Sequence, residues 1–154
     1  MPEENKSNNE IKDVENNILS AYSVSPAHNF AADKKTINRN LYFVDFLRAL
    51  GLIKDAAKVL DIGCGTGWVV EMFRRKGHEV YGGDILPIKI MRERFPKGKY
   101  LYFDIFEPPQ DAQKYDFIYI RSLGPLDKHP DWRDLALFPW IGDHLNGGGV
   151  LFRA

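Results

Sequence analysis

Apolar residues recur at helical spacing ahead of residue 51 and gather into short runs after it. The stretch 36–50 carries apolar side chains at intervals of three and four residues, namely Ile37, Leu41, Val44, Leu47 and Leu50. This spacing predicts a helix over Thr36–Leu50 with one face packed on a core. Gly51 follows it directly and is predicted to form its C-terminal cap.

From residue 58 onward, short apolar runs alternate with helix-like segments. The predicted strands are Lys58–Ile62, Glu79–Gly83, Lys99–Phe103, Asp116–Ile120 and Gly149–Phe152. The predicted helices are Trp68–Lys76, closed by Gly77, then Ile85–Phe95 and Trp132–Leu145. This alternation predicts an α/β fold with a doubly wound, mainly parallel sheet. In such a sheet, the binding crevice lies beyond the carboxyl ends of the strands.

Polarity divides the chain of 154 residues into three parts. Residues 1–20 are rich in Asn, Glu, Lys and Ser, and we expect a flexible polar tail with a frayed helix over 11–19. Residues 21–35 are predicted to form a loop before the domain, and residues 36–154 to form the folded domain.

Charge and hydropathy narrow the class of protein. The 21 basic and 21 acidic residues cancel, which argues against a nucleic-acid partner held by a strongly basic surface. We expect no membrane span, because no apolar run is long enough, and a cytoplasmic location, because the first residues lack the pattern of a secretory signal. The single cysteine, Cys64, excludes an internal disulfide and is interpreted as a small filler rather than a nucleophile or metal ligand.

A glycine-rich turn, Gly63-Cys64-Gly65-Thr66-Gly67, joins the first predicted strand to the helix at Trp68. Glycine permits positive φ and lets a ligand lie against the backbone, while the helix start directs free N–H groups toward that ligand. Asp84 ends the next strand, where a carboxylate can accept hydrogen bonds from both hydroxyls of a ribose. Asp104 ends the strand after that.

Residues 59–67 resemble the hallmark motif of class I S-adenosylmethionine-dependent methyltransferases, an acidic residue followed by Gly-x-Gly-x-Gly. The resemblance covers about residues 36–154 and continues through the segments 82–85, 104–105, 115–121 and 145–151. It implies the Rossmann-like methyltransferase fold, S-adenosylmethionine as cofactor, no metal, and methyl transfer to an acceptor. The stretch 121–126 lacks the Asn-Pro-Pro-aromatic motif of amino methyltransferases that act on adenine or glutamine, which argues against a nucleic-acid acceptor. We expect a small-molecule acceptor, chiefly because the region of the fourth strand resembles small-molecule methyltransferases.

The resemblance also implies a set of cofactor-binding residues. Gly63, Gly65 and Gly67, with Cys64 between them, would border the methionine and ribose parts of the cofactor, and Asp61 would reach its amino group. Asp84 would bind the ribose, Ile85 would cover the adenine, and Asp104 with Ile105 would form the turn that contacts the adenine. Arg121 would contact the methionine portion or the acceptor, or else form a surface salt bridge.

Catalytic residues do not follow from the resemblance, because the sulfonium methyl is already activated and a general base is needed only for some acceptors. The candidates on the acceptor side are Tyr22, His28, Asn29, Arg121, Ser122, Asp127 and His129. His78 is predicted to face solvent in a turn, and His144 to lie at a helix end where the helix dipole favours it.

Two alternatives stay open. A dinucleotide-binding protein also uses a strand, a glycine turn and an acidic strand end, although its usual Gly-x-Gly-x-x-Gly spacing is not met here, where Trp68 follows Gly67. The full family fold also continues beyond a fifth strand, whereas this sequence ends at Ala154. Besides an active enzyme, the sequence therefore allows a truncated or degenerate cofactor-binding module without turnover. It also allows a domain that dimerises along the exposed fifth strand.

Overall fold

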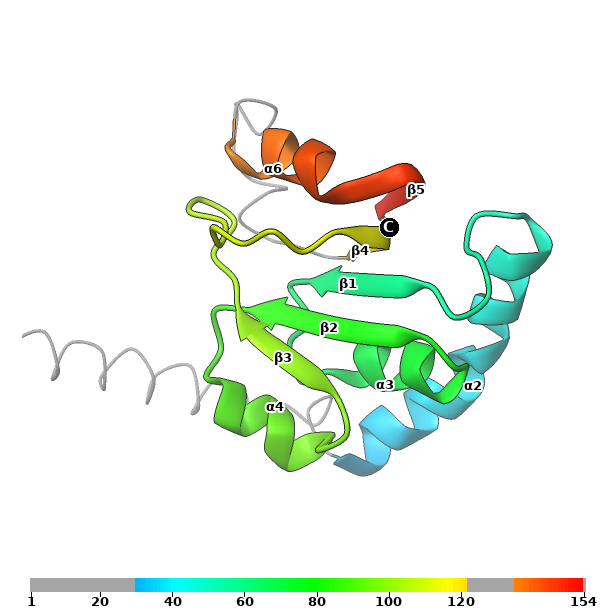
Figure 1. Cartoon of the computed structure of the whole chain (residues 1–154). Coiled ribbons are helices and arrows are strands. Elements are labelled where there is room, and N and C mark those ends of the chain that lie inside the picture. Colours follow the sequence, from blue (N-terminus) through cyan, green and yellow to red (C-terminus); the bar gives the residue numbers. More distant parts are fainter. Residues whose placement is uncertain (1–29, 122–134, 154) are drawn as a thin grey trace, which may run out of the picture.

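Five parallel strands form a sheet in the computed structural model, which describes residues 30–121 and 135–153 (Figure 1). The strands are β1 Lys58–Ile62, β2 Glu79–Asp84, β3 Lys99–Tyr102, β4 Tyr115–Ile120 and β5 Leu145–Arg153. Their order is β3-β2-β1-β4-β5, and each neighbouring pair is parallel. The strand order reverses between β1 and β4, which confirms the predicted doubly wound sheet and places its switch point there.

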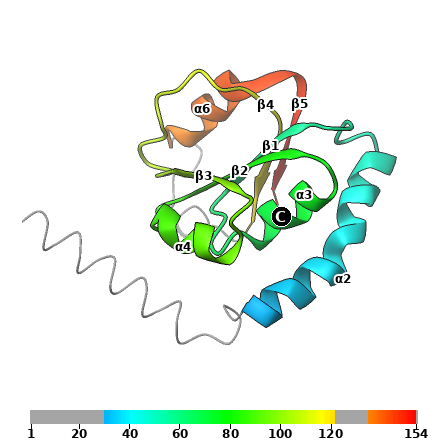
Figure 2. The ribbon, with the colours of Figure 1, turned by 60° about the horizontal axis from the view of Figure 1, so that its bottom comes forward.

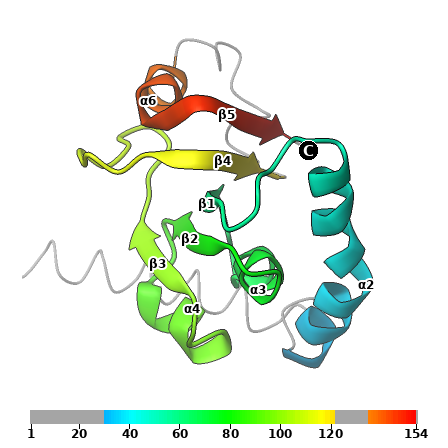
Figure 3. The ribbon, with the colours of Figure 1, turned by 45° about the vertical axis from the view of Figure 1, so that its right-hand side comes forward.

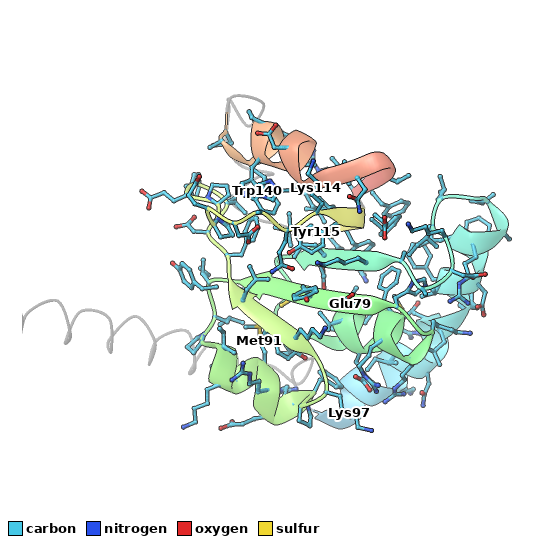
Figure 4. The ribbon with its side chains drawn as sticks, in the orientation of Figure 1. Glu79, Met91, Lys97, Lys114, Tyr115 and Trp140 are labelled. Carbon is cyan, nitrogen blue, oxygen red and sulfur yellow. The ribbon has the colours of Figure 1, made fainter. Side chains whose placement is uncertain are left out.

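Helices pack on both faces of this sheet. They are α2 Phe30–Ala49, α3 Trp68–Arg75, α4 Ile88–Arg94 and α6 Leu137–His144. Figure 2 shows α2, α3 and α4 on one side of the strands and α6 on the other. Two clusters of buried side chains follow this division: Met91 of α4 belongs to the first, and Tyr115 and Trp140 belong to the second (Figure 4).

Helix α2 packs on the sheet largely as its apolar spacing predicts, and it runs along one side of the molecule past α3 (Figure 3). Ile37, Val44 and Leu47 are fully buried, whereas Leu50 is 55% exposed. The prediction for Leu50 was wrong because two successive steps of three residues turn it about 120° away from Val44 on a helix of 3.6 residues per turn. Gly51, at φ 71°, ends the helix as predicted.

The helix also starts earlier than its apolar stripe suggests. Its first residue is Phe30, so the end of the predicted loop 21–35 is helical. No proline or glycine interrupts the sequence between Phe30 and Thr36, and Ala31 and Ala32 favour a helix. The predicted tail 1–20 and the loop residues up to 29 lie outside the described residues.

Three other boundaries differ from the predictions. Helix α4 begins at Ile88 rather than Ile85, because the Asp84 side chain accepts a hydrogen bond from Leu86 N–H and holds a turn before Pro87. Helix α6 begins at Leu137, and the predicted start at Trp132 lies outside the described residues. Strand β5 begins at Leu145 rather than Gly149, because residues 146–149 form a bulge within it: pairing with β4 stops after Leu145 and resumes at Val150.

No helix covers the sheet face over β2 and β3 on the α6 side within the described residues, because the connection 103–114 is irregular. Tyr81 and Tyr115 lie on this face, and the Lys58 ammonium sits 5.2 Å and 5.5 Å from their ring centres. Lys99 lies 5.1 Å from the Tyr81 ring and pairs with Glu79. Lysine side chains therefore shield these two tyrosines, of which Tyr81 is partly exposed and Tyr115 is buried.

Candidate functional site

The glycine turn after β1 is tied to the end of β2. Gly63, Gly65 and Gly67 have φ values of 76°, 54° and 90°, in the left-handed region that other residues avoid. The N–H groups of Gly63 and Cys64 both donate to the carbonyl of Gly83, at 2.8 and 3.1 Å. A Cβ at Gly67 would lie 2.8 Å from the Tyr100 hydroxyl. Backbone conformation and packing both require glycine at this last position.

Asp84 is bound to this turn, as the strand pattern predicts. One carboxylate oxygen accepts from Gly65 N–H at 2.8 Å, and the other accepts from Leu86 N–H at 3.0 Å. Each oxygen keeps a further lone pair. Asp84 can therefore hold the turn and still accept hydrogen bonds from a bound hydroxyl.

The end of β3 joins the same edge of the sheet. Phe103 N–H donates to the Asp84 carbonyl at 2.9 Å, so Asp104 lies next to the end of β2. The Asp104 carboxylate accepts from Phe106 N–H at 2.9 Å, which turns the chain locally. The three predicted strand ends therefore lie next to one another.

Two neighbouring apolar side chains at this turn differ in exposure. Ile105, predicted to border the cofactor, is 7% exposed and packs in the second core cluster, whereas Phe106 is 47% exposed. Ile85, predicted to cover a ligand, is 53% exposed. Sequence reasoning missed Phe106, because nothing in the residue order indicates which of two neighbouring apolar residues the Asp104 turn directs outward.

Asp61 is the most unusual carboxyl group at this edge. It is 2% exposed, and its Oδ2 atom has no hydrogen-bond partner among the described residues. Its pKa is raised to about 8, first by burial and then by the Asp84 charge, while the Arg121 charge acts in the opposite direction. A buried carboxyl oxygen without a hydrogen-bond partner is costly. It suits a bound cation that would pair with its ionised form.

Cys64 takes part in the turn through its backbone. Its thiol is buried, lies 3.3 Å from the sulfur of Met91, and is placed so that a Cβ on Gly82 would meet it at 2.8 Å. Burial raises the pKa of this thiol, which disfavours the reactive thiolate. The thiol fills space in the core, in keeping with its interpretation as a filler.

A pocket of about 280 Å³ opens beside the glycine turn. Five of its eight lining residues are aromatic, contributed by α2, α3, β4 and β5: Tyr42, Phe43, Trp68, Tyr119 and Phe152. The other three are Asn40, Met72 and Arg121. We call it the aromatic pocket. Sequence reasoning did not find it, because its walls come from four elements that are distant along the chain.

Arg121 follows the last residue of β4 and lies at this pocket. Its guanidinium carbon is 5.3 Å from the centre of the Trp68 ring, a cation–π arrangement. It forms no ion pair within 4 Å with a carboxylate of the described residues, so the predicted alternative of a surface salt bridge is not seen there.

The two described histidines lie away from the site. His78, predicted to face solvent, is 4% exposed and accepts a hydrogen bond from Ala57 N–H at 3.1 Å, so that prediction was wrong. Burial and the nearby Arg48 charge lower its pKa. His144 stacks on Trp140 at 3.8 Å and bonds to backbone carbonyls of Trp140 and Asp111. Both histidines act in packing.

Some predicted candidates cannot be located. Tyr22, His28, Asn29, Ser122, Asp127 and His129 lie outside the described residues. Within residues 30–121 and 135–153, no three His, Cys, Asp or Glu side chains gather where a metal ion could bind. The described helices include none with the length and apolar character needed to cross a bilayer.

Comparison with known proteins gives a consistent result. Residues 35–153 match the model of a family described as a methyltransferase domain. A malonyl-[acyl-carrier protein] O-methyltransferase from Salmonella typhimurium is 32% identical over 111 residues, which are 71% of this chain and 39% of that protein. The chain thus spans about two fifths of the length of this relative.

Two solved structures show the same fold. An S-adenosylmethionine-dependent methyltransferase from Clostridium acetobutylicum superposes with a TM-score of 0.60 at 21% identity, over 96% of this chain and 56% of that one. A TehB-like methyltransferase from Corynebacterium glutamicum gives a TM-score of 0.58 at 22% identity, over 81% and 73% of the two chains. The chain therefore belongs to the methyltransferase-domain family and has the Rossmann-like fold of class I methyltransferases.

Proposed function

We propose that this domain binds S-adenosylmethionine across the carboxyl ends of β1, β2 and β3 and transfers its methyl group to a small-molecule acceptor. The observation that carries the proposal is the buried carboxyl of Asp61 just before the glycine turn, whose Oδ2 atom has no hydrogen-bond partner among the described residues. The amino acid part of the cofactor brings an ammonium group, which could donate a hydrogen bond to this oxygen. Asp84, fastened to the same turn, supports the assignment.

The residues at the three strand ends fit the rest of the cofactor. Asp84 would accept hydrogen bonds from the ribose hydroxyls and Asp104 from the adenine amino group. The exposed side chains of Ile85 and Phe106 offer apolar cover for a flat base. When bound, the cofactor supplies a methyl group on a positively charged sulfur, ready for attack. The protein then has to align an acceptor and exclude water.

An oxygen acceptor has independent support. The relative from Salmonella typhimurium is named as an O-methyltransferase. The aromatic pocket next to Trp68, the first residue after the glycine turn, offers room for a small acceptor close to the cofactor. We propose that the acceptor enters there.

Ligand binding tests the proposal directly. Calorimetry of the full chain with S-adenosylhomocysteine should give a saturable isotherm, and Asp84→Ala should weaken binding at least tenfold, because a ribose loses its hydrogen-bond acceptor. The matched control is Asp143→Ala, an exposed carboxylate on α6 that should leave the affinity unchanged. Tighter binding of NAD than of S-adenosylhomocysteine would refute the proposal in favour of a dinucleotide site.

Turnover needs a separate measurement. With isotope-labelled S-adenosylmethionine, label should pass into a low-molecular-weight fraction of a cell extract. Saturable binding of S-adenosylhomocysteine without transfer of label to any fraction would favour the alternative of a cofactor-binding module without turnover.

A further inference from the structure

The aromatic pocket lies where an acceptor would meet the cofactor. Trp68 in its wall comes directly after Gly67 of the glycine turn, and Arg121 comes directly after β4 at the switch point of the sheet. Phe43 of α2 closes the side opposite the strands and packs edge-on against Phe152 at 5.7 Å. The pocket, about 280 Å³, is slightly smaller than the usual range for ligand sites, about 300–1,000 Å³. Only a small molecule, or the tip of a larger one, fits it.

The walls of the pocket favour a flat apolar body. Tyr119 and Phe152 stack with their ring planes 3° apart and their centres 5.7 Å apart, so neighbouring strands present a row of parallel rings. Trp68 adds a further ring from α3. Such rings bind planar groups by stacking and edge contacts.

Among the described residues, one charged residue lines the pocket, and the buried carboxyl of Asp61, on which the Arg121 charge acts, lies outside the lining. Arg121 is the charged residue in the wall, and no carboxylate of the described residues lines the pocket or pairs with this guanidinium within 4 Å. Because a guanidinium is always protonated and binds carboxylates well, the pocket favours an anion and repels an ammonium.

The lining offers no group that would remove a proton from the acceptor. No histidine, lysine or carboxylate is among the eight lining residues. Tyr119 is 4% exposed, and burial raises the pKa of its hydroxyl, so it stays protonated at neutral pH. An alcohol or an ammonium would have to lose a proton to become a nucleophile, whereas a carboxylate is already ionised in neutral water.

We propose that the aromatic pocket binds a small planar carboxylate through Arg121, and that the domain converts this carboxylate to its methyl ester. The inference rests on the proposed function and deepens it. One carboxylate oxygen donates a lone pair to the methyl carbon while the bond from that carbon to sulfur breaks and its electron pair stays on sulfur. The anionic acceptor and the sulfonium become a neutral ester and a neutral thioether. No proton moves, which matches a pocket without a base.

Binding of simple probes tests this without turnover. The full chain, saturated with S-adenosylhomocysteine, is titrated with benzoate and phenylacetate, with neutral benzamide, and with cationic benzylamine. We expect the two carboxylates to bind at least tenfold more tightly than benzamide, and benzylamine to give no measurable binding. Arg121→Ala should lower benzoate affinity at least tenfold, and Arg121→Lys should restore part of it. The matched control is Arg92→Ala, at an exposed arginine on α4, which should leave the benzoate affinity unchanged.

Several outcomes would overturn the inference. Equal affinity for benzoate and benzamide, or binding of neither carboxylate to a chain that binds S-adenosylhomocysteine, would refute it and leave the proposed function standing. 5′-Methylthioadenosine lacks the amino acid part of S-adenosylhomocysteine. If Arg121→Ala weakens the binding of S-adenosylhomocysteine but not that of 5′-methylthioadenosine, Arg121 binds the cofactor and the inference also fails. A chain that does not bind S-adenosylhomocysteine at all would refute both proposals.

Discussion

Burial keeps Asp61 protonated at neutral pH, and this gives cofactor binding a measurable dependence on pH. The pKa of this carboxyl is raised to about 8, first because burial disfavours the charged form and then because the Asp84 carboxylate is near. In the proposed complex, the cofactor ammonium would pair with the ionised form of Asp61. Binding must therefore release the proton that Asp61 holds.

The size of the effect follows from this pKa. At pH 7, a group with a pKa of about 8 carries about 0.9 of a proton, which should be released almost completely on binding. Below pH 8, each fall of one pH unit should lower the affinity for S-adenosylhomocysteine about tenfold, and above pH 8 the affinity should become independent of pH. A ligand that binds the protonated carboxyl would instead bind more tightly as the pH falls.

Calorimetry can measure both quantities. Titrations from pH 6 to 8 give the slope, and titrations at pH 7 in phosphate and in Tris give the released protons, because these buffers differ in ionisation enthalpy. Asp61→Asn should remove the slope and the buffer-dependent heat, and it should weaken binding at pH 8. The control Asp143→Asn, at an exposed residue of α6, should leave the pH slope and the buffer-dependent heat unchanged. An affinity that is constant from pH 6 to 8, with no proton release, would refute the role assigned to Asp61.

Two further predictions concern the stability of the unliganded chain. Because the folded-state pKa of Asp61 lies above the unfolded value of about 3.9, the proton stabilises the folded form; this contribution is fully present below pH 4 and is lost as pH rises through about 8. Asp61→Asn should therefore raise the melting temperature relative to the wild type more at pH 8.5 than at pH 6, and an equal effect at both would contradict the assigned pKa. Gly67→Ala should destabilise the domain by about 1–3 kcal/mol, because φ is 90° and the new Cβ would meet the Tyr100 hydroxyl. Gly142→Ala in α6, where nothing lies within 4 Å, should instead stabilise it by about 0.5–1 kcal/mol. Urea unfolding of the two variants should give shifts of opposite sign.

The parts of this molecule that depend on local sequence were predictable. Strand β1 has the predicted bounds, because a short apolar run between a lysine and a glycine turn has few other solutions. The approach of Asp84 to the glycine turn was predictable too, since the carboxyl ends of neighbouring parallel strands share one edge of the sheet. The functional roles of these residues stay predictions.

What could not be predicted depends on contacts between distant segments. His78 follows a glycine at the end of a helix, which is typical of an exposed turn, yet α2 and the residues before β1 cover it. Phe106 is exposed and Ile105 is buried at a turn held by one side-chain hydrogen bond of Asp104. The aromatic pocket depends on Phe43 of α2 packing against Tyr119 of β4 and Phe152 of β5, a placement that the spacing of apolar residues in one helix does not determine.

The missing crossover helix between β3 and β4 divides the sheet into two halves with unequal protection. Apolar side chains pack against both faces of β1 and β4. On one face of β2 and β3, by contrast, Tyr81 and Leu101 are only partly buried. Among the described residues, β3 is also an edge strand of the sheet. Local opening of the folded chain should therefore begin at β3 and spread inward, with its backbone amides exchanging with solvent before those of β1. Because β3 leads into Asp104, such opening would loosen the adenine side of the proposed cofactor site while leaving the glycine turn intact.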